Sequence, residues 1–181
     1  IVGRPNTGKS TLVNALVGSK VVITSPHPNT TRHAIRGIVN EPDFQAILVD
    51  TPGVHKPKTL LGKRLNAVVE ESLDSVDVII ICLPADEESG AGDQYIIDEI
   101  AKHPRSKKIA LVTKTDLISK ANLATRLASI MAMAKGFTWD EIVPVSAATH
   151  EQIDLLKKLI GQQLKPGPEF YPTNMRSDQT I

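Results

Sequence analysis

The chain has 181 residues, of which 41% are hydrophobic and 23% are charged, as expected for one globular domain of ordinary size. Its 21 basic and 20 acidic residues leave a formal net charge of +1, which excludes a strong overall attraction to nucleic acid or anionic lipid. No apolar run approaches the roughly 20 residues of a membrane helix, which excludes an integral membrane protein. The single cysteine, Cys82, excludes an internal disulfide and fits a reducing, cytoplasmic setting.

Short apolar runs of strand length alternate with longer segments of helical period. Strands are predicted at residues 1–2, 34–40, 44–50, 78–83, 109–112 and 142–145. Helices are predicted at residues 11–16, 61–69, 123–131 and 153–164. This alternation predicts a doubly wound α/β domain, with helices on both faces of a mostly parallel sheet. Residues 41–43 read as a hairpin turn, so one antiparallel edge strand is expected.

The end of the chain differs in composition from the rest. Residues 166–181 are polar and proline-containing, and they show no periodicity. We expect residues 1–165 to form the domain and residues 166–181 to be a linker or tail that leads away from it.

The most specific motif is Gly3-Arg4-Pro5-Asn6-Thr7-Gly8-Lys9-Ser10, which matches G-x-x-x-x-G-K-[ST] at every fixed position. It has the strand–loop–helix context that this motif needs. The main-chain N–H groups of such a loop point at phosphate oxygens, and the helix adds its positive end. Lys9 would neutralise the β- and γ-phosphates, and Ser10 would ligate Mg²⁺. Nucleotide contacts are therefore predicted for Asn6, Thr7, Gly8, Lys9, Ser10 and Thr11.

A second motif, Asp50-Thr51-Pro52-Gly53, follows an apolar strand. Because this motif would lie at the carboxyl edge of the sheet, we expect it to lie beside the phosphate loop. Asp50 is suited to hold Mg²⁺, commonly through water, and the N–H of Gly53 is suited to meet a γ-phosphate. Alone, this tetrapeptide is as readily a strand end and a turn, but its place after a phosphate loop favours the functional interpretation.

The sequence Lys114-Thr115-Asp116 ends another buried strand and predicts guanine recognition. A carboxylate there accepts hydrogen bonds from N1–H and N2–H₂ of guanine, a pair of donors that adenine lacks. Lys114 would lay its apolar stem along the base. After a further strand, the small residues Ser146, Ala147 and Ala148 would offer backbone N–H groups to the guanine O6 atom.

Together these motifs resemble the translation-factor class of P-loop GTPases, and the connecting sequences resemble the Era family of bacterial ribosome-assembly GTPases. The Era resemblance is carried by residues 3–14, by Asn-Thr-Thr-Arg-His at 29–33, by Val-Asp-Thr-Pro-Gly-Val-His at 49–55 and by Pro-Glu-Phe-Tyr-Pro at 168–172. The resemblance covers essentially the whole chain. It implies a Ras-like G domain, a P-loop NTPase fold with a mixed, mostly parallel six-stranded sheet.

The resemblance also implies further nucleotide contacts. In that family a threonine closes over the nucleotide and ligates Mg²⁺ in the triphosphate state; Thr31 takes that position here, with Thr30 as the second candidate. The family usually has Asn-Lys-x-Asp at the base-recognition strand, where this chain has Thr113 in place of the asparagine. A threonine hydroxyl is shorter than an amide and offers one donor instead of two, which puts the contacts of this strand with the phosphate loop in question.

Hydrolysis in this chain requires a group other than a side-chain base to stabilise the charge that develops in the transition state. Many GTPases orient the attacking water with a glutamine after the D-x-x-G glycine, whereas this chain has Val54, which cannot polarise water. The resemblance places it among GTPases with a hydrophobic residue there, and Asn6 matches the asparagine that holds a monovalent cation in potassium-activated relatives. The hypothesis is that K⁺ near Asn6 neutralises charge developing between the β- and γ-phosphates, while backbone groups around Gly53 place the water. Lys9 and Thr31 are the other predicted catalytic residues. The alternative for Asn6 is a turn-forming role in a tight loop.

The expected activity is Mg²⁺-dependent hydrolysis of GTP to GDP and phosphate. The resemblance implies a role in 30S subunit assembly and 16S rRNA processing, with the RNA bound by a C-terminal KH domain that we expect to lie outside this chain. A monomeric cytoplasmic protein is expected, with peripheral attachment at the inner membrane left open. Two alternatives remain: the GTPase domain of a related tRNA-modification or ribosome-assembly protein, and a nucleotide-sensing module that never hydrolyses its ligand.

Overall fold

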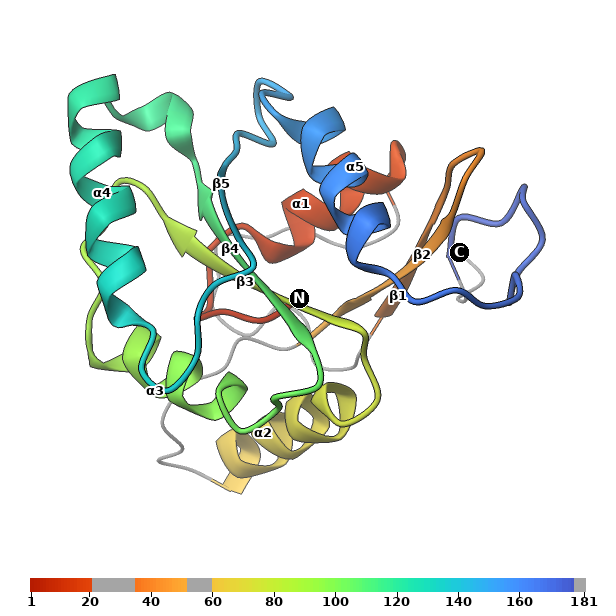
Figure 1. Cartoon of the computed structure of the whole chain (residues 1–181), viewed down its shortest axis with the longest axis horizontal. Helices are drawn as coiled ribbons and strands as arrows, with labels where there is room; N and C mark the ends of the chain where they lie inside the picture. Colours follow the sequence, from red (N-terminus) through yellow and green to blue (C-terminus); the bar gives the residue numbers. More distant parts are fainter. Residues whose placement is uncertain (21–34, 52–59, 178–181) are drawn as a thin grey trace.

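The computed structural model describes residues 1–20, 35–51 and 60–177 (Figure 1). Strands and helices alternate over these ranges, as the sequence predicts. Thr31 and Gly53, which the sequence predicts to act in binding and hydrolysis, lie outside the described residues, as does Val54, so the roles of Thr31 and Gly53 stay predictions.

The centre of the fold is a three-stranded parallel sheet in the order β3-β4-β5. β3 spans Val78–Pro84, β4 spans Lys107–Thr113 and β5 spans Glu141–Pro144. These short apolar runs suit strands that are covered on both faces, and every side chain from Ile79 to Pro84 is buried. Because the strands are parallel, their carboxyl ends lie at one edge of the sheet.

A two-stranded antiparallel hairpin stands beside this sheet. β1 (Ile35–Asn40) pairs with β2 (Gln45–Asp50), which confirms the predicted hairpin. The Ile1 nitrogen donates to the Val49 carbonyl at 2.9 Å, and Val2 forms a parallel bridge with β3. The expected six-stranded sheet is therefore wrong. The described residues form sheets of three and two strands, because the segment before the phosphate loop contributes one bridge instead of a ladder.

Helices cover both faces of the parallel sheet. α1 (Lys9–Val17) and α5 (Ile153–Gln163) pack on one face, in a core that includes the even-numbered residues Ile80 and Cys82 of β3. α2 (Leu60–Leu73), α3 (Ala91–Ile100) and α4 (Lys120–Met133) contribute to a second core, which includes the odd-numbered residues Ile79, Ile81 and Leu83. Alternate side chains of β3 thus pack against helices on opposite faces of the sheet. Within the described ranges no helix is long and apolar enough to cross a membrane.

Helix α3 is not among the elements predicted from the sequence. Its buried apolar stripe consists of Ile96, Ile97 and Ile100, which is too short for a clear helical period. The helix begins after Gly90, whose N–H donates to the Asp93 carboxylate at 3.2 Å. A carboxylate in the first turn stabilises the helix start by this contact and by its charge.

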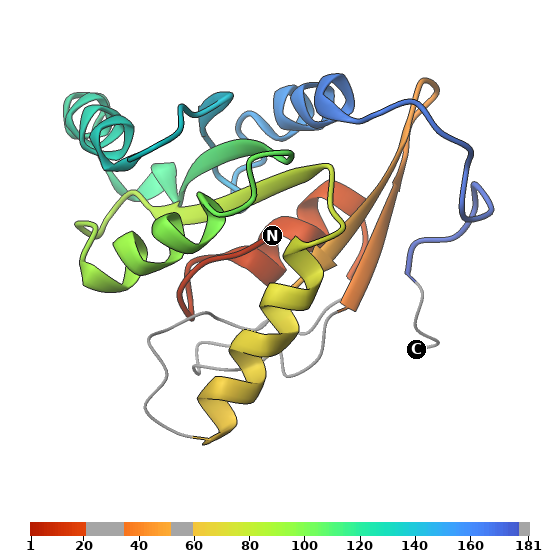
Figure 2. The ribbon, with the colours of Figure 1, turned by 60° about the horizontal axis from the view of Figure 1, so that its bottom comes forward.

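The segment after α5 returns to the hairpin instead of leading away from it (Figure 2). Gly37 of β1 forms an antiparallel bridge with Ser177. The Gln45 side chain donates to the Tyr171 carbonyl at 2.8 Å, and its oxygen accepts the N–H of Phe170 at 3.0 Å. The predicted linker is therefore held against β1 and β2 as far as Ser177.

Candidate functional site

The predicted phosphate loop runs from the bridge with β3 into α1. Gly8, the residue before α1, has a φ of 96°, in the left-handed region that favours glycine. Asn6 also has a positive φ, of 62°, a conformation that asparagine adopts more readily than most residues. These backbone turns fold the loop closely around the first residue of α1, Lys9.

The Lys9 side chain lies inside the curl of this loop. Its ammonium group donates to the Gly3 carbonyl at 3.2 Å and to the Arg4 carbonyl at 2.7 Å, and the residue is only 7% exposed. Burial lowers the pKa of this ammonium group, because the charged form loses hydration. An anion bound in the loop would reverse that cost, so the site is electrostatically suited to phosphate.

Ser10 and Asp50 bring two oxygen atoms together beside the loop. The Ser10 hydroxyl donates to one Asp50 carboxylate oxygen at 2.8 Å, and Asp50 is fully buried at the end of β2. Hydroxyl and carboxylate oxygens are the ligands that Mg²⁺ prefers in proteins. The predicted magnesium pair is thus assembled by the end of one strand and the start of one helix.

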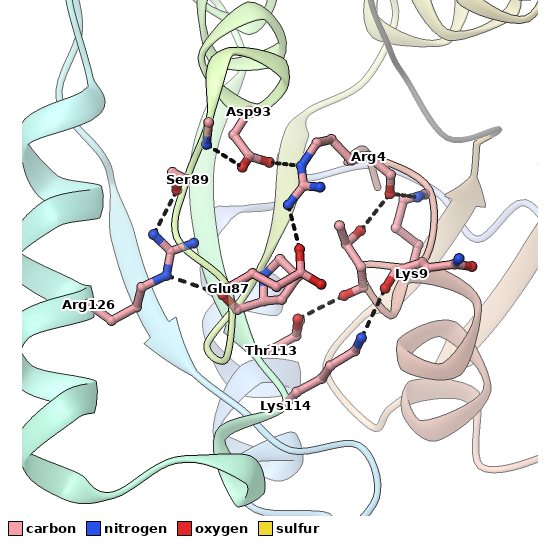
Figure 3. Close-up of polar contacts among 12 residues, drawn as sticks. Arg4, Lys9, Glu87, Ser89, Asp93, Thr113, Lys114 and Arg126 are labelled. Carbon is pink, nitrogen blue, oxygen red and sulfur yellow. Dashed lines mark hydrogen bonds and ion pairs between the residues drawn. The ribbon is translucent and has the colours of Figure 1, made fainter. Parts of the chain in front are cut away.

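The end of β4 is tied to the phosphate loop by two hydrogen bonds (Figure 3). The Thr113 hydroxyl donates to the Thr7 carbonyl at 2.8 Å, and the Lys114 ammonium group donates to the Asn6 carbonyl at 3.0 Å. Both Thr7 and Thr113 are buried. The threonine in place of the usual asparagine therefore does contact the phosphate loop, with its one donor.

Asp116 is exposed, and a neighbouring hydroxyl holds its carboxylate in place. The Ser146 hydroxyl donates to the carboxylate at 2.8 Å, and it accepts the N–H of Thr149 at 3.2 Å. Ala147 and Ala148 lie in the turn between Ser146 and Thr149. One oxygen of the Asp116 carboxylate is thus held by a hydrogen bond, and the turn of small residues lies beside it; recognition of guanine by these groups stays a prediction.

The described residues of the predicted site lie on the phosphate loop, the end of β2, the end of β4 and the turn after β5. Thr11 lies exposed in the first turn of α1. Thr31 and Gly53 fall outside the described residues.

The structure adds one contact that sequence reasoning missed. Arg4, at a position that the phosphate-loop motif leaves open, donates to Asp93 of α3 at 2.7 Å. No sequence pattern joins two residues that are 89 positions apart. The only available signal is an acidic residue in the first turn of a helix that was itself not predicted.

Comparisons with known proteins show the family to which the chain belongs. A model of the 50S ribosome-binding GTPase family matches residues 1–115, which is more than half of the chain. The chain is 54% identical over 180 residues to the GTPase Era of Streptomyces coelicolor, a match that covers 98% of this chain and 57% of that protein. It is also 52% identical over 180 residues to the GTPase Era of Mycobacterium avium, covering 99% of this chain and 60% of that protein.

Solved structures agree with this match. Era in complex with MgGDPNP and nucleotides 1506–1542 of 16S ribosomal RNA is 35% identical, with a TM-score of 0.91, over 99% of this chain and 60% of that one. The chain thus spans less than two thirds of the length of these relatives. The predicted resemblance to the Era GTPase domain is confirmed, and the chain belongs to the family of 50S ribosome-binding GTPases.

Proposed function

We propose that this chain is a G domain that binds GTP together with Mg²⁺ and hydrolyses it to GDP and phosphate. The observation that carries the proposal is the direct contact of the base-recognition strand with the phosphate loop, through Thr113 and Lys114. One nucleotide would place its phosphates around Lys9 and its base at Asp116. The Era complex with MgGDPNP supports this proposal, because the two folds are closely similar.

The residues present fit a divalent cation. Ser10 and Asp50 place two hard oxygen ligands 2.8 Å apart at the phosphate loop. We expect Ser10 and Thr31 to ligate Mg²⁺ directly and Asp50 to hold it through water. When bound, the ion would neutralise charge on the β- and γ-phosphate oxygens, and the Lys9 ammonium group would bind the same oxygens. The N–H of Gly53 would position the γ-phosphate.

The binding part of the proposal is tested by competition between nucleotides. A fluorescent GDP analogue is displaced from the chain by GDP or by ADP in the presence of Mg²⁺. We expect GDP to compete far more strongly, because adenine would leave the Asp116 carboxylate without two donors. Equal competition by ADP would favour a kinase or ATPase and contradict guanine recognition.

The catalytic part is tested by single-turnover hydrolysis of GTP, followed as released phosphate. Slow but measurable conversion is expected, because the residue after Gly53 is a valine and supplies no base. GTP that stays intact for hours, with K⁺ and ribosomal subunits added, would favour the nucleotide-sensing module that does not hydrolyse its ligand.

We further propose that K⁺ stimulates the reaction near Asn6. The Asn6 residue is exposed on the loop, where its side chain is accessible to a hydrated ion. We expect faster hydrolysis in KCl than in NaCl of equal concentration, and a loss of this difference in an Asn6→Ala variant. Equal rates in the two salts would rule out the potassium site.

The expected partners are the 30S subunit and 16S rRNA, bound through a KH domain that follows the tail in the full-length protein. The Era complex with a 16S rRNA fragment supports this proposal. We expect the full-length protein to bind such a fragment and this chain to bind it at least tenfold more weakly, a difference of about 1.4 kcal/mol. We expect both to be monomers. Equal binding by the two would place the RNA site within the G domain.

A further inference from the structure

The phosphate loop has an anchor outside the nucleotide site, formed by the side chain of Arg4. Its guanidinium group donates from Nε to Asp93 at 2.7 Å and from Nη2 to Glu87 at 2.9 Å (Figure 3). The Asp93 side chain is completely buried, whereas that of Glu87 is 48% exposed. The buried, charge-assisted bond to Asp93 is therefore the stronger of the two, since exposed ion pairs contribute little.

The main chain of the same residue holds Lys9, the lysine predicted to bind the phosphates. The Arg4 carbonyl accepts the Lys9 ammonium group at 2.7 Å and the Thr7 hydroxyl at 2.9 Å. Arg4 thus binds α3 with its side chain and Lys9 with its carbonyl oxygen. A displacement of the Arg4 side chain would move the carbonyl to which the lysine is bonded.

Asp93, to which the Arg4 side chain is bonded, is itself held in place. The second Asp93 oxygen accepts the N–H of Gly90 at the start of α3, so both oxygens of this buried carboxylate are used. Gly92 leaves the space that the Arg4 stem occupies, because a Cβ atom there would lie 2.9 Å from Arg4 Cδ. Arg126 of α4 donates to the Pro84 carbonyl at 3.2 Å, which holds the chain between β3 and α3.

We infer that Arg4 and Asp93 are positioning residues for the nucleotide phosphates: their ion pair fixes the Arg4 carbonyl and, through it, places the Lys9 ammonium group for the β-phosphate. This inference rests on the proposed function of the site. It means that nucleotide affinity also depends on the ion pair of Arg4 with Asp93, a contact that does not involve the nucleotide. A fully buried carboxylate is also costly to leave without its ion-pair partner, so the Arg4–Asp93 pair is a strong constraint on the loop.

The test compares GDP with GMP, which lacks the β-phosphate and so does not depend on the placement of Lys9. Arg4→Gln, Asp93→Asn and the double variant are measured by competition against fluorescent GDP. We expect each variant to bind GDP about tenfold more weakly, with GMP affinity changed by less than about twofold. Because both substitutions break the same contact, the double variant should resemble either single variant.

Local charge cannot explain this expected pattern. Arg4→Gln removes a positive charge near the phosphates, whereas Asp93→Asn removes a negative one. Simple Coulomb attraction would therefore make Asp93→Asn bind GDP more tightly. Arg105→Gln and Asp98→Asn are matched controls at exposed positions, and we expect them to bind both ligands as the unmodified chain does.

Three outcomes would overturn the inference: unchanged or tighter GDP binding by Asp93→Asn, equal loss of GDP and GMP affinity, or additive losses in the double variant. Asp93→Asn retains an acceptor for the N–H of Gly90, so it decides the question if Arg4→Gln fails to fold. Failure of the unmodified chain to bind GDP would overturn the proposed function, and the inference with it.

Discussion

The hydroxyl of Thr113 donates to the carbonyl of Thr7 at 2.8 Å, so the last residue of β4 holds the middle of the phosphate loop. The family usually has an asparagine at position 113, as the sequence resemblance implies. A single hydroxyl in the right place is sufficient for the contact with the loop, because one carbonyl oxygen requires one donor.

Thr113→Val removes this donor with little change in shape and leaves the buried Thr7 carbonyl without it. We expect the free energy of unfolding to fall by about 1–3 kcal/mol, and GDP to dissociate faster. Thr125→Val, at an exposed position of α4, should change stability by less than about 0.5 kcal/mol. Chemical denaturation and the release of fluorescent GDP measure the two effects. A Thr113→Val variant as stable as the control would show that the bond contributes nothing.

Asp116→Asn should change the base that the chain prefers. An asparagine presents a carbonyl acceptor and an NH₂ group where aspartate presents two acceptor oxygens, and xanthine carries a carbonyl oxygen where guanine carries its amino group. We therefore expect the affinity for GDP to fall about 100-fold or more and the affinity for xanthosine diphosphate to rise. Competition between the two nucleotides measures this, with the exposed Asp154→Asn as control. Unchanged preference would place the base elsewhere.

The lowered pKa of Lys9 predicts pH-dependent binding on the alkaline side. In the free protein the ammonium group loses its proton below its ordinary value of 10.5, because burial disfavours the charge. Bound phosphate favours the charged form and raises this pKa. At pH values between the pKa of the free protein and that of the complex, binding is therefore accompanied by uptake of a proton. GDP affinity should therefore fall as the pH rises towards 10.5.

Guanine also loses a proton in the alkaline range, so the control for this prediction is Lys9→Arg. That variant shares the titration of the base but keeps its positive charge. We expect a steeper loss of GDP affinity with pH for the unmodified chain than for Lys9→Arg, measured by calorimetry. Parallel pH profiles would mean that Lys9 keeps its proton in the free protein.

Cys82 should be unreactive in the folded protein. It is completely buried in β3, and burial raises the pKa of its thiol to about 12. The reactive thiolate is therefore nearly absent at neutral pH. We expect a disulfide reagent to modify Cys82 only at the rate at which the chain unfolds, and rapidly in denaturant. Fast modification of the native protein would show that β3 opens locally.

The sequence alone names the residues that the structure brings together around the phosphate loop, because each of them belongs to a local motif. Lys9 and Ser10 are set by a single continuous loop, and Asp50 and Thr113 each end an apolar strand. The ion pair of Arg4 with Asp93 could not be predicted in this way, because it depends on how α3 packs beside the loop. The sequence predicts Ser146 only for its backbone N–H; the bond of its hydroxyl to Asp116 could not be predicted, because it depends on two strand ends lying side by side.

The return of the tail to the hairpin determines where the rest of a longer protein would begin. The N–H of Ile38 donates to the carbonyl of Arg176 at 2.9 Å, so the path of the tail is bonded to the edge of β1. β1 directly follows the predicted nucleotide-sensing segment that contains Thr31. A module that follows this tail would therefore be joined to a segment that is bonded to β1 as far as Ser177.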